Sequence, residues 1–157
     1  MISILFVCTG NICRSPALAA TLQKLINENG LTERVYIDSC AVSSLFLGAP
    51  ADPRMVEIAH QKGVHIEHKA KLFEDSYFQL FDYILAADHN VIKTLQIMAV
   101  TDANKAKIHL ATEYSSLYKD QDVYDPYYDG EAGFKKVMLM IEEIAQSLYT
   151  KIILGKA

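Results

Sequence analysis

The amino-acid sequence predicts an α/β fold in which helices cover both faces of a parallel sheet. Short apolar segments alternate along the chain with longer segments whose apolar residues have helical spacing. The first apolar segment is rich in β-branched and aromatic residues, which is typical of a strand buried on both faces. The chain has 157 residues, of which 51% are hydrophobic, so we expect a single domain over residues 1–157 with a substantial core.

The first predicted strand covers residues 2–7, and Cys8 stands at its end. Ser15 and Pro16 predict the start of a helix. A serine hydroxyl can cap free backbone N–H groups, and proline fits the first helical position. Apolar residues then recur at helical spacing as far as Gly30, where we expect the helix to end.

The rest of the chain continues the same alternation of strands and helices. Further strands are predicted at residues 34–40, 81–87 and 107–111, and further helices at 52–63, 88–98 and 134–152. Asp52 and Asp88 are the expected N-caps of two of these helices. Residues 112–130 are polar and rich in tyrosine, and predict a loop. In a parallel sheet of this kind the ligand lies beyond the carboxyl ends of the strands, which is where Cys8 is expected.

Composition and charge exclude several classes of protein. The formal net charge is -4, whereas a protein that binds nucleic acid irrespective of sequence is usually basic. The N-terminal segment MISILFV has no basic region and only a short apolar run, so it predicts neither a signal peptide nor a membrane span. The three cysteines are too few for a secreted disulfide framework. We therefore expect a soluble cytoplasmic protein with reduced thiols, which binds neither nucleic acid nor membrane.

The loop over residues 9–15 has the properties of a phosphate-binding cradle. Gly10 and Asn11 tolerate left-handed backbone conformations, so successive N–H groups can point inward. The helix that follows adds unpaired N–H groups and a positive dipole, and Arg14 adds a charged planar fork. Cys8 would lie at the base of this cradle, where positive charge favours the nucleophilic thiolate. The alternative is that Cys8 is a small buried hydrophobic residue.

Hydrolysis of a phosphate ester also needs an acid that protonates the leaving oxygen. The best candidate is Asp125 in the segment VYDPYYDG, because the proline after it restricts the loop and three tyrosines surround it. Aromatic side chains at the mouth of a pocket can stack on an aromatic substrate. The alternative interpretation is a solvated acidic turn, since Asp-Pro is common in turns.

The segment VCTGNICRSP, together with the late DPYY, resembles the low-molecular-weight protein tyrosine phosphatases. The resemblance covers almost the whole chain, because IDSCAVSS, GAPADPR, HKAK and FDYILAAD occur in the order typical of that family. It implies a three-layer, flavodoxin-like fold with a four-stranded parallel sheet in the order 2-1-3-4. It also implies hydrolysis of phosphotyrosine, and of small aryl phosphates, through a cysteinyl-phosphate intermediate.

The resemblance assigns a role to each residue of the motifs. Cys8 is the implied nucleophile, Arg14 binds the phosphoryl oxygens, and Asp125 acts first as acid and then as base. The implied phosphate-binding residues are Thr9, Gly10, Asn11, Ile12, Cys13 and Ser15, of which Ser15 also hydrogen-bonds the thiolate. The implied residues around the cradle are Ser39 and His68, which with Asn11 hold its shape, and Leu45, Tyr127 and Tyr128 at the pocket mouth. We also expect Phe46, the neighbour of Leu45, to contribute to the pocket. Many members have tryptophan or tyrosine where Leu45 stands, so this chain lacks an aromatic wall at that position.

Two rival functions use a similar loop. Arsenate reductases of the same fold need two further cysteines after the third strand, and residues 81–100 contain none. A catalytically silent phosphotyrosine-binding module would be expected to lose Cys8 or Asp125, and both are present. We expect tyrosine-phosphorylated proteins as partners and phosphate-like oxyanions as inhibitors, with no metal or cofactor. Cys13 is either a packing residue or, as the resemblance favours, a redox partner of Cys8.

Overall fold

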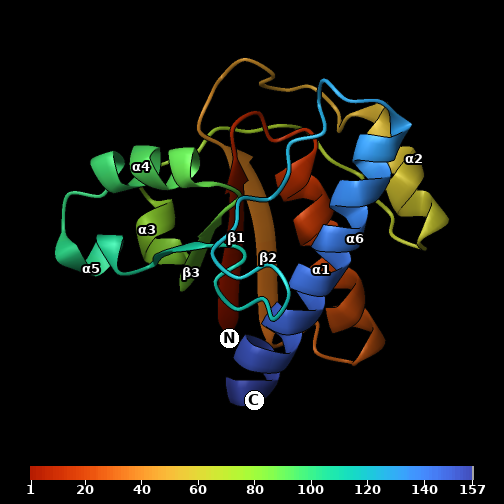
Figure 1. Ribbon diagram of the computed structural model, residues 1–157. Helices are drawn as coiled ribbons and strands as arrows, with labels where there is room; N and C mark the ends of the chain where they lie inside the picture. Colours follow the sequence, from red (N-terminus) through yellow and green to blue (C-terminus); the bar gives the residue numbers. More distant parts are fainter. Residues whose placement is uncertain (157) are drawn as a thin grey trace.

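A computed structural model describes residues 1–156 and has a four-stranded parallel sheet at its centre (Figure 1). The strands are β1 (Ile2–Cys8), β2 (Val35–Ala41), β3 (Tyr83–Ala86) and β4 (Ile108–Leu110). They lie in the order β2-β1-β3-β4, and each neighbouring pair is parallel. The predicted α/β class and the implied strand order are therefore confirmed.

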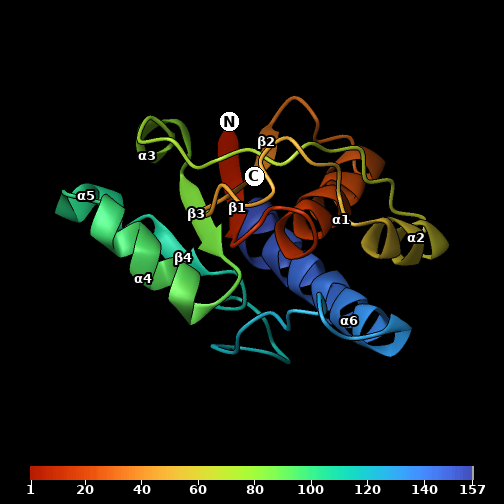
Figure 2. The same cartoon turned by 90° about the horizontal axis from the view of Figure 1, so that it is seen from above.

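Helices form a layer on each face of this sheet. The helices are α1 (Arg14–Glu28), α2 (Pro53–Gln61), α3 (Tyr77–Leu80), α4 (His89–Met98), α5 (Asp102–Lys105), α6 (Glu131–Leu148), the π-helical η1 (Tyr149–Ile153) and α7 (Leu154–Lys156). Seen from above, α1, α2 and α6 lie on one side of the sheet, and α3, α4 and α5 lie on the other (Figure 2). The result is the predicted three-layer arrangement.

Two apolar cores, one on each face of the sheet, explain why β1 is a continuous apolar run. Ile4 and Phe6 belong to the core beneath α1 and α6, whereas Leu5 and Val7 belong to the core beneath α4. All four side chains are fully buried, because successive residues of a strand point to opposite faces. Burial of each such side chain stabilises the fold by about 1.5–3 kcal/mol. The strand thus holds Cys8 firmly at the carboxyl edge of the sheet.

The start of α1 differs from the prediction. The helix begins at Arg14, its N-cap position is Cys13, and no side chain caps it. Ser15 lies inside the first turn, so its predicted role as N-cap is wrong. Its hydroxyl instead contacts the Cys8 sulfur and the Asn11 side chain. The hydroxyl therefore makes its hydrogen bonds at the end of β1 and does not cap the helix.

The other predicted caps are confirmed. Asp52 accepts a hydrogen bond from the N–H of Arg54 at the start of α2, and Asp88 accepts one from the N–H of Val91 at the start of α4. Helices α3 and α5 are not predicted, because four residues are too few to show a helical period. Residues 112–130 contain neither helix nor strand, as expected for that loop.

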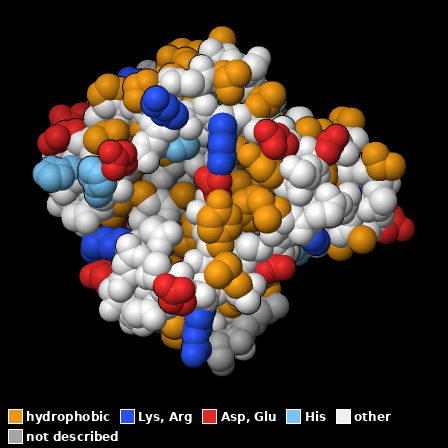
Figure 3. Space-filling model, turned by 180° about the vertical axis from the view of Figure 1, so that it is seen from behind, with side chains coloured by type: hydrophobic (Ala, Val, Ile, Leu, Met, Phe, Trp, Pro, Cys, Tyr) orange, Lys and Arg blue, Asp and Glu red, His pale blue; other side chains and the backbone are white. Residues whose placement is uncertain are grey.

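The described part of the chain contains no helix that is both long enough and apolar enough to cross a membrane. The face seen from behind carries lysine and arginine side chains that are separated by carboxylates and uncharged groups (Figure 3). This face therefore has no continuous basic surface.

Candidate active site

The loop between β1 and α1 forms the floor of a pocket of about 160 Å³. Every residue from Cys8 to Arg14 lines this pocket. The remaining lining residues come from two distant loops: Leu45, Phe46, Asp125, Tyr127 and Tyr128. The structure thus brings the predicted nucleophile, arginine, acid and mouth residues to one place at the carboxyl edge of the sheet.

Asn11 sets the shape of the loop. Its backbone φ is 58°, in the left-handed region, and its side chain is fully buried. The side-chain Nδ2 donates to Ser15 Oγ at 2.8 Å and to Ser39 Oγ at 3.0 Å, and Oδ1 accepts from the Lys71 N–H at 3.1 Å. Asparagine tolerates this conformation better than most residues, and the buried hydrogen bonds hold it there.

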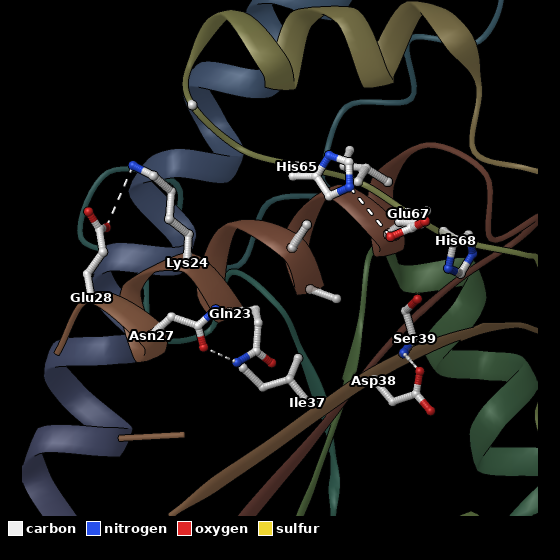
Figure 4. A pocket seen from close by; sticks show the side chains of 15 residues that line it. Gln23, Lys24, Asn27, Glu28, Ile37, Asp38, Ser39, His65, Glu67 and His68 are labelled. Carbon is white, nitrogen blue, oxygen red and sulfur yellow. Dashed lines mark hydrogen bonds and ion pairs between the residues drawn. The ribbon is translucent and has the colours of Figure 1, made fainter. Parts of the chain in front are cut away.

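His68 supports the same turn from outside. Its Nε2 lies 2.8 Å from the carbonyl oxygen of Asn11, so Nε2 carries the proton and donates it. Burial lowers the pKa of His68, which favours the neutral ring. His68 and Ser39 also line a groove of about 490 Å³ between α1, β2 and residues 63–68 (Figure 4). The structure therefore places Ser39 and His68 beside Asn11, as the resemblance implies.

The sulfur of Cys8 is buried and surrounded by donors. The side chain is 3% exposed, the N–H of Asn11 donates to Sγ at 3.2 Å, and Ser15 Oγ lies 2.9 Å from Sγ. The N-terminus of α1 begins in the same loop and adds the positive end of its dipole. These groups stabilise a negative charge on sulfur at the base of the pocket.

Arg14 is buried, with 4% exposure, and is held by acceptors from two parts of the chain. Its Nη1 donates to Asp88 Oδ2 at 2.8 Å and to the carbonyl oxygen of Val123 at 3.1 Å. Its Nη2 lies 3.8 Å from Asp125 Oδ2. Burial opposes the charge, but Cys8, Asp88 and Asp125 outweigh it and raise the pKa of Arg14. The guanidinium is therefore a permanent, oriented cation beside the side chain of Cys8.

Sequence analysis missed the contact between Asp88 and Arg14. Asp88 was recognised only as the cap of α4, through Oδ1, while its other oxygen binds the arginine. Its position was a usable signal, because Asp88 follows β3 and β3 is the neighbour of β1 in the sheet. The contact between Arg14 and the carbonyl of Val123 could not be predicted from the sequence, because every residue has a backbone carbonyl.

Asp125 stands at the rim of the pocket. Its side chain is 54% exposed, and Oδ1 accepts a hydrogen bond from the N–H of Tyr127 at 3.2 Å. The carboxylate thus faces both solvent and the space above Arg14. A group in this position can exchange a proton with a substrate oxygen and with water.

Phe46 and Tyr127 form the aromatic part of the pocket mouth. Their ring centroids are 5.7 Å apart, with the planes at 50°. Phe46 also packs directly on Gly10, where a Cβ atom would come within 2.7 Å of the ring. Leu45 and Tyr128 lie further out, at 76% and 94% exposure. Phe46 rather than Leu45 therefore faces Tyr127.

Arg54 connects the pocket mouth to helices α2 and α6. No sequence motif predicts this role for Arg54. Its guanidinium donates to both oxygens of Asp52, at 3.0 and 2.7 Å. The same group lies 4.5 Å from the ring centre of Phe134 and 5.5 Å from that of Tyr127. The contacts connect the start of α2, the start of α6 and the Asp125 loop.

Cys13 is buried beside the same carboxylate. Burial, and next the charge of Asp52, raise the pKa of the Cys13 thiol, so it stays protonated at neutral pH. Cys40 is fully buried in the core and its pKa is raised by burial in the same way. All three cysteines are free thiols. Among residues 1–156 no cluster of three or more histidine, cysteine or acidic side chains is arranged to hold a metal ion.

The Cys8 sulfur accepts a hydrogen bond from a loop N–H, Arg14 is paired with a carboxylate beside it, and a second carboxylate stands at the rim. These groups together are typical of phosphatases of the cysteine-dependent class. Residues 3–155 match the family described as "Low molecular weight phosphotyrosine protein phosphatase", and the chain belongs to that family. These proteins are cysteine-dependent hydrolases, and their mechanism passes through a cysteinyl-phosphate.

Relatives and solved structures agree with this membership. The low molecular weight phosphotyrosine protein phosphatase of Schizosaccharomyces pombe is 35% identical over 152 residues, which cover 96% of this chain and 97% of that protein. A protein tyrosine phosphatase from Entamoeba histolytica, with Hepes in its active site, has a TM-score of 0.93 and 35% identity, covering all of both chains. Vibrio vulnificus Wzb in complex with benzylphosphonate has a TM-score of 0.83 and 27% identity, covering 96% and 99% of the two chains.

Proposed function

We propose that this enzyme removes phosphate from phosphotyrosine in proteins, and from small aryl phosphates, with Cys8 as nucleophile, Arg14 as phosphate ligand and Asp125 as proton donor. The observation that carries the proposal is the convergence of these three side chains on one small pocket. Ser15 contacts the sulfur of Cys8, and Asp88 pairs with Arg14. Asp125 is exposed at the rim, where it can reach both substrate and water.

In the first step the thiolate of Cys8 attacks phosphorus in line with the ester bond. The S–P bond forms while the P–O bond to the aryl group breaks, and the carboxylic acid of Asp125 gives its proton to the departing oxygen. Arg14 and the backbone N–H groups of residues 9–15 bind the equatorial oxygens. Because these donors are already oriented, they stabilise the transition state without reorganising.

In the second step water hydrolyses the cysteinyl-phosphate. The carboxylate of Asp125 accepts a proton from the water, whose oxygen bonds to phosphorus while the S–P bond breaks. The electron pair returns to Cys8, where Ser15 and the N–H of Asn11 stabilise the new thiolate. Inorganic phosphate then leaves, and Asp125 is protonated for the next cycle.

The surroundings of the pocket support an aryl substrate and a protein partner. The rings of Phe46 and Tyr127 provide apolar walls for a tyrosine ring, and the exposed Leu45 and Tyr128 lie where a protein surface would meet the rim. Hepes and benzylphosphonate in the structures of the two relatives support phosphate-like oxyanions as ligands of this loop. Free thiols suit a reducing compartment, so we place the enzyme in the cytoplasm.

The test is a comparison of Cys8→Ser with the wild type on a phosphotyrosine peptide and on the matching phosphoserine peptide. Wild type should hydrolyse the first and leave a phosphoryl group on Cys8 that mass spectrometry detects after acid quenching. Cys8→Ser should lose turnover but retain phosphotyrosine proteins from a lysate. Cys40→Ala is the control, because Cys40 is also a buried free thiol but does not line the pocket. Hydrolysis by Cys8→Ser at the wild-type rate would refute the covalent mechanism.

A further inference from the structure

The two acceptors that orient Arg14 belong to segments that are far apart in the chain. Asp88 precedes α4, and Val123 lies in the loop 112–130. Both accept from the same nitrogen, Nη1, so the direction of the guanidinium depends on how these two segments sit against each other. Asp125 follows Val123 by two residues, so the position of the proposed acid depends on the same junction.

A second contact lies one residue away on each segment. His89 follows Asp88, and Asp122 precedes Val123. The backbone N–H of His89 donates to Asp122 Oδ1 at 2.9 Å, and the ring Nδ1 lies 2.5 Å from the same oxygen. The N–H of Val123 also donates to the carbonyl of Ala87 at 2.7 Å. These bonds join residues 87–89 to residues 122–123 directly behind the two acceptors of Arg14.

The charges at this junction favour the contact between His89 and Asp122. His89 is the first residue of the ten-residue helix α4, so its N–H has no partner within the helix. The Asp122 carboxylate accepts a hydrogen bond from that N–H, at the positive end of the α4 dipole. Burial opposes ionisation of Asp122, but hydrogen bonds from the backbone and ring of His89 outweigh it and lower the pKa of Asp122. Nδ1 then carries the proton that it donates to the carboxylate.

We propose that His89 and Asp122 are positioning residues for the reaction, which hold Asp88 and Val123 against Arg14 and set the base of the Asp125 loop. They act through Arg14 and Asp125 and have no contact with the substrate pocket. This inference rests on the proposed function. It predicts that breaking the contact weakens phosphate binding and proton donation together.

The experiment compares Asp122→Ala and His89→Ala with His109→Ala. His109 makes a similar contact, with Nδ1 2.9 Å from Glu113 Oε2, at β4 and away from the pocket. The affinity for inorganic phosphate is measured by calorimetry, and kcat/KM is measured for phenyl phosphate and p-nitrophenyl phosphate. Because both side chains are about half exposed, the contact is a weak one. We expect each variant to lose about 2- to 5-fold in phosphate affinity.

Loss of kcat/KM should be larger for phenyl phosphate, whose poorer leaving group needs the acid more, and His109→Ala should behave as wild type. The double variant of His89 and Asp122 should lose no more than Asp122→Ala alone, because Asp122→Ala already removes both bonds, whereas His89→Ala removes only the ring bond. Equal losses in the two substrates with unchanged phosphate affinity would overturn the inference, as would losses matched by His109→Ala. Phosphate affinity is measured without turnover, so the inference can fail while Cys8→Ser still supports the proposed function, and the two failures are told apart.

Discussion

The hydroxyl oxygen of Ser15 lies 2.9 Å from the sulfur of Cys8 and 2.8 Å from the side-chain nitrogen of Asn11. Because Asn11 Nδ2 can only donate, Ser15 Oγ accepts that bond and is free to direct its own proton at the sulfur. The buried chain Ser39–Asn11–Ser15–Cys8 therefore leads from the edge strand β2 to the proposed nucleophile.

Ser15→Ala should lower kcat while KM for an aryl phosphate changes little. The variant removes a hydrogen bond to an ion, which is worth about 1.5–3 kcal/mol, or roughly 10- to 100-fold in rate. Iodoacetamide should also alkylate Cys8 more slowly at mildly acidic pH. Ser43→Ala is the control, because its hydroxyl accepts a hydrogen bond from the Leu45 backbone N–H, away from the sulfur of Cys8. Unchanged kcat in Ser15→Ala would show that the hydroxyl does not stabilise the thiolate.

Asp125→Asn should slow hydrolysis of phosphotyrosine by roughly 10²- to 10⁴-fold, the usual range for a positioned acid and base. The amide cannot protonate the leaving oxygen, so esters with very good leaving groups should suffer less in the first step. Asp129→Asn, which changes an acid of the same loop that does not line the pocket, is the matched control. Hydrolysis of phosphotyrosine by Asp125→Asn at close to the wild-type rate would count against Asp125 as the acid.

Phe46→Leu should raise KM for aryl phosphates by roughly 2- to 12-fold, because an aromatic pair contributes about 0.5–1.5 kcal/mol beyond area burial. The ring of Phe46 already faces Tyr127, whereas Leu45 is mostly exposed. Leu45→Trp should therefore lower the aryl KM less than Phe46→Leu raises it. Steady-state kinetics on matched aryl and alkyl phosphates decide this. A larger effect at Leu45 would mean that Leu45 supplies the second wall of the pocket.

Mild peroxide should inactivate the enzyme, and thiol reductants should restore it, if Cys8 and Cys13 can form a disulfide. Cys13 is held as a protonated thiol, so Cys8 should be oxidised first, by peroxide, to the sulfenic acid. The Cys13 sulfur then attacks the Cys8 sulfur, the S–O bond breaks, and the hydroxyl leaves as water with the proton of Cys13. Cys13→Ala should stay active but become irreversibly oxidised, whereas Cys40→Ala should recover as wild type does. Full recovery of Cys13→Ala after peroxide would remove any protective role for Cys13.

Glu143→Gln should destabilise the protein near neutral pH and much less in acid. The carboxylate of Glu143 accepts bonds from Ser115 Oγ, Ser147 Oγ and the N–H groups of Ser116 and Leu117. Burial opposes its ionisation, but these bonds outweigh burial and lower the pKa of Glu143. A lowered pKa in the folded state stabilises the protein above the unfolded pKa, near 4.3, and this contribution is lost as the pH falls through the folded pKa.

The expected loss for Glu143→Gln near neutral pH is about 1 kcal/mol, since the group is partly exposed. Thermal unfolding of the wild type and the variant across the acid range measures it. The exposed Glu57→Gln is the control. A difference in Tm that does not shrink in acid would show that the charge of Glu143 is not what holds residues 115–118.

Those features of the fold that depend on neighbouring residues can be predicted from the amino-acid sequence. The alternation of strands and helices, the caps at Asp52 and Asp88 and the loop after Cys8 all follow from short-range patterns of polarity and backbone preference. The motifs around Cys8, Arg14 and Asp125 were enough to identify the family. Short helices and exact boundaries escaped prediction, because a few residues carry no period.

The groups that hold the proposed catalytic side chains come from distant parts of the chain, and the folded protein is needed to identify them. Arg14 is bound to Asp88, 74 residues away, and to the carbonyl of Val123, 109 residues away. Ser15 turns towards Cys8 rather than capping its helix, and Phe46 rather than Leu45 faces Tyr127. Such choices depend on the order of the strands, which brings the ends of β1 and β3 together. The site is completed by backbone carbonyls and side-chain rotamers, whose positions cannot be predicted from the residue types alone.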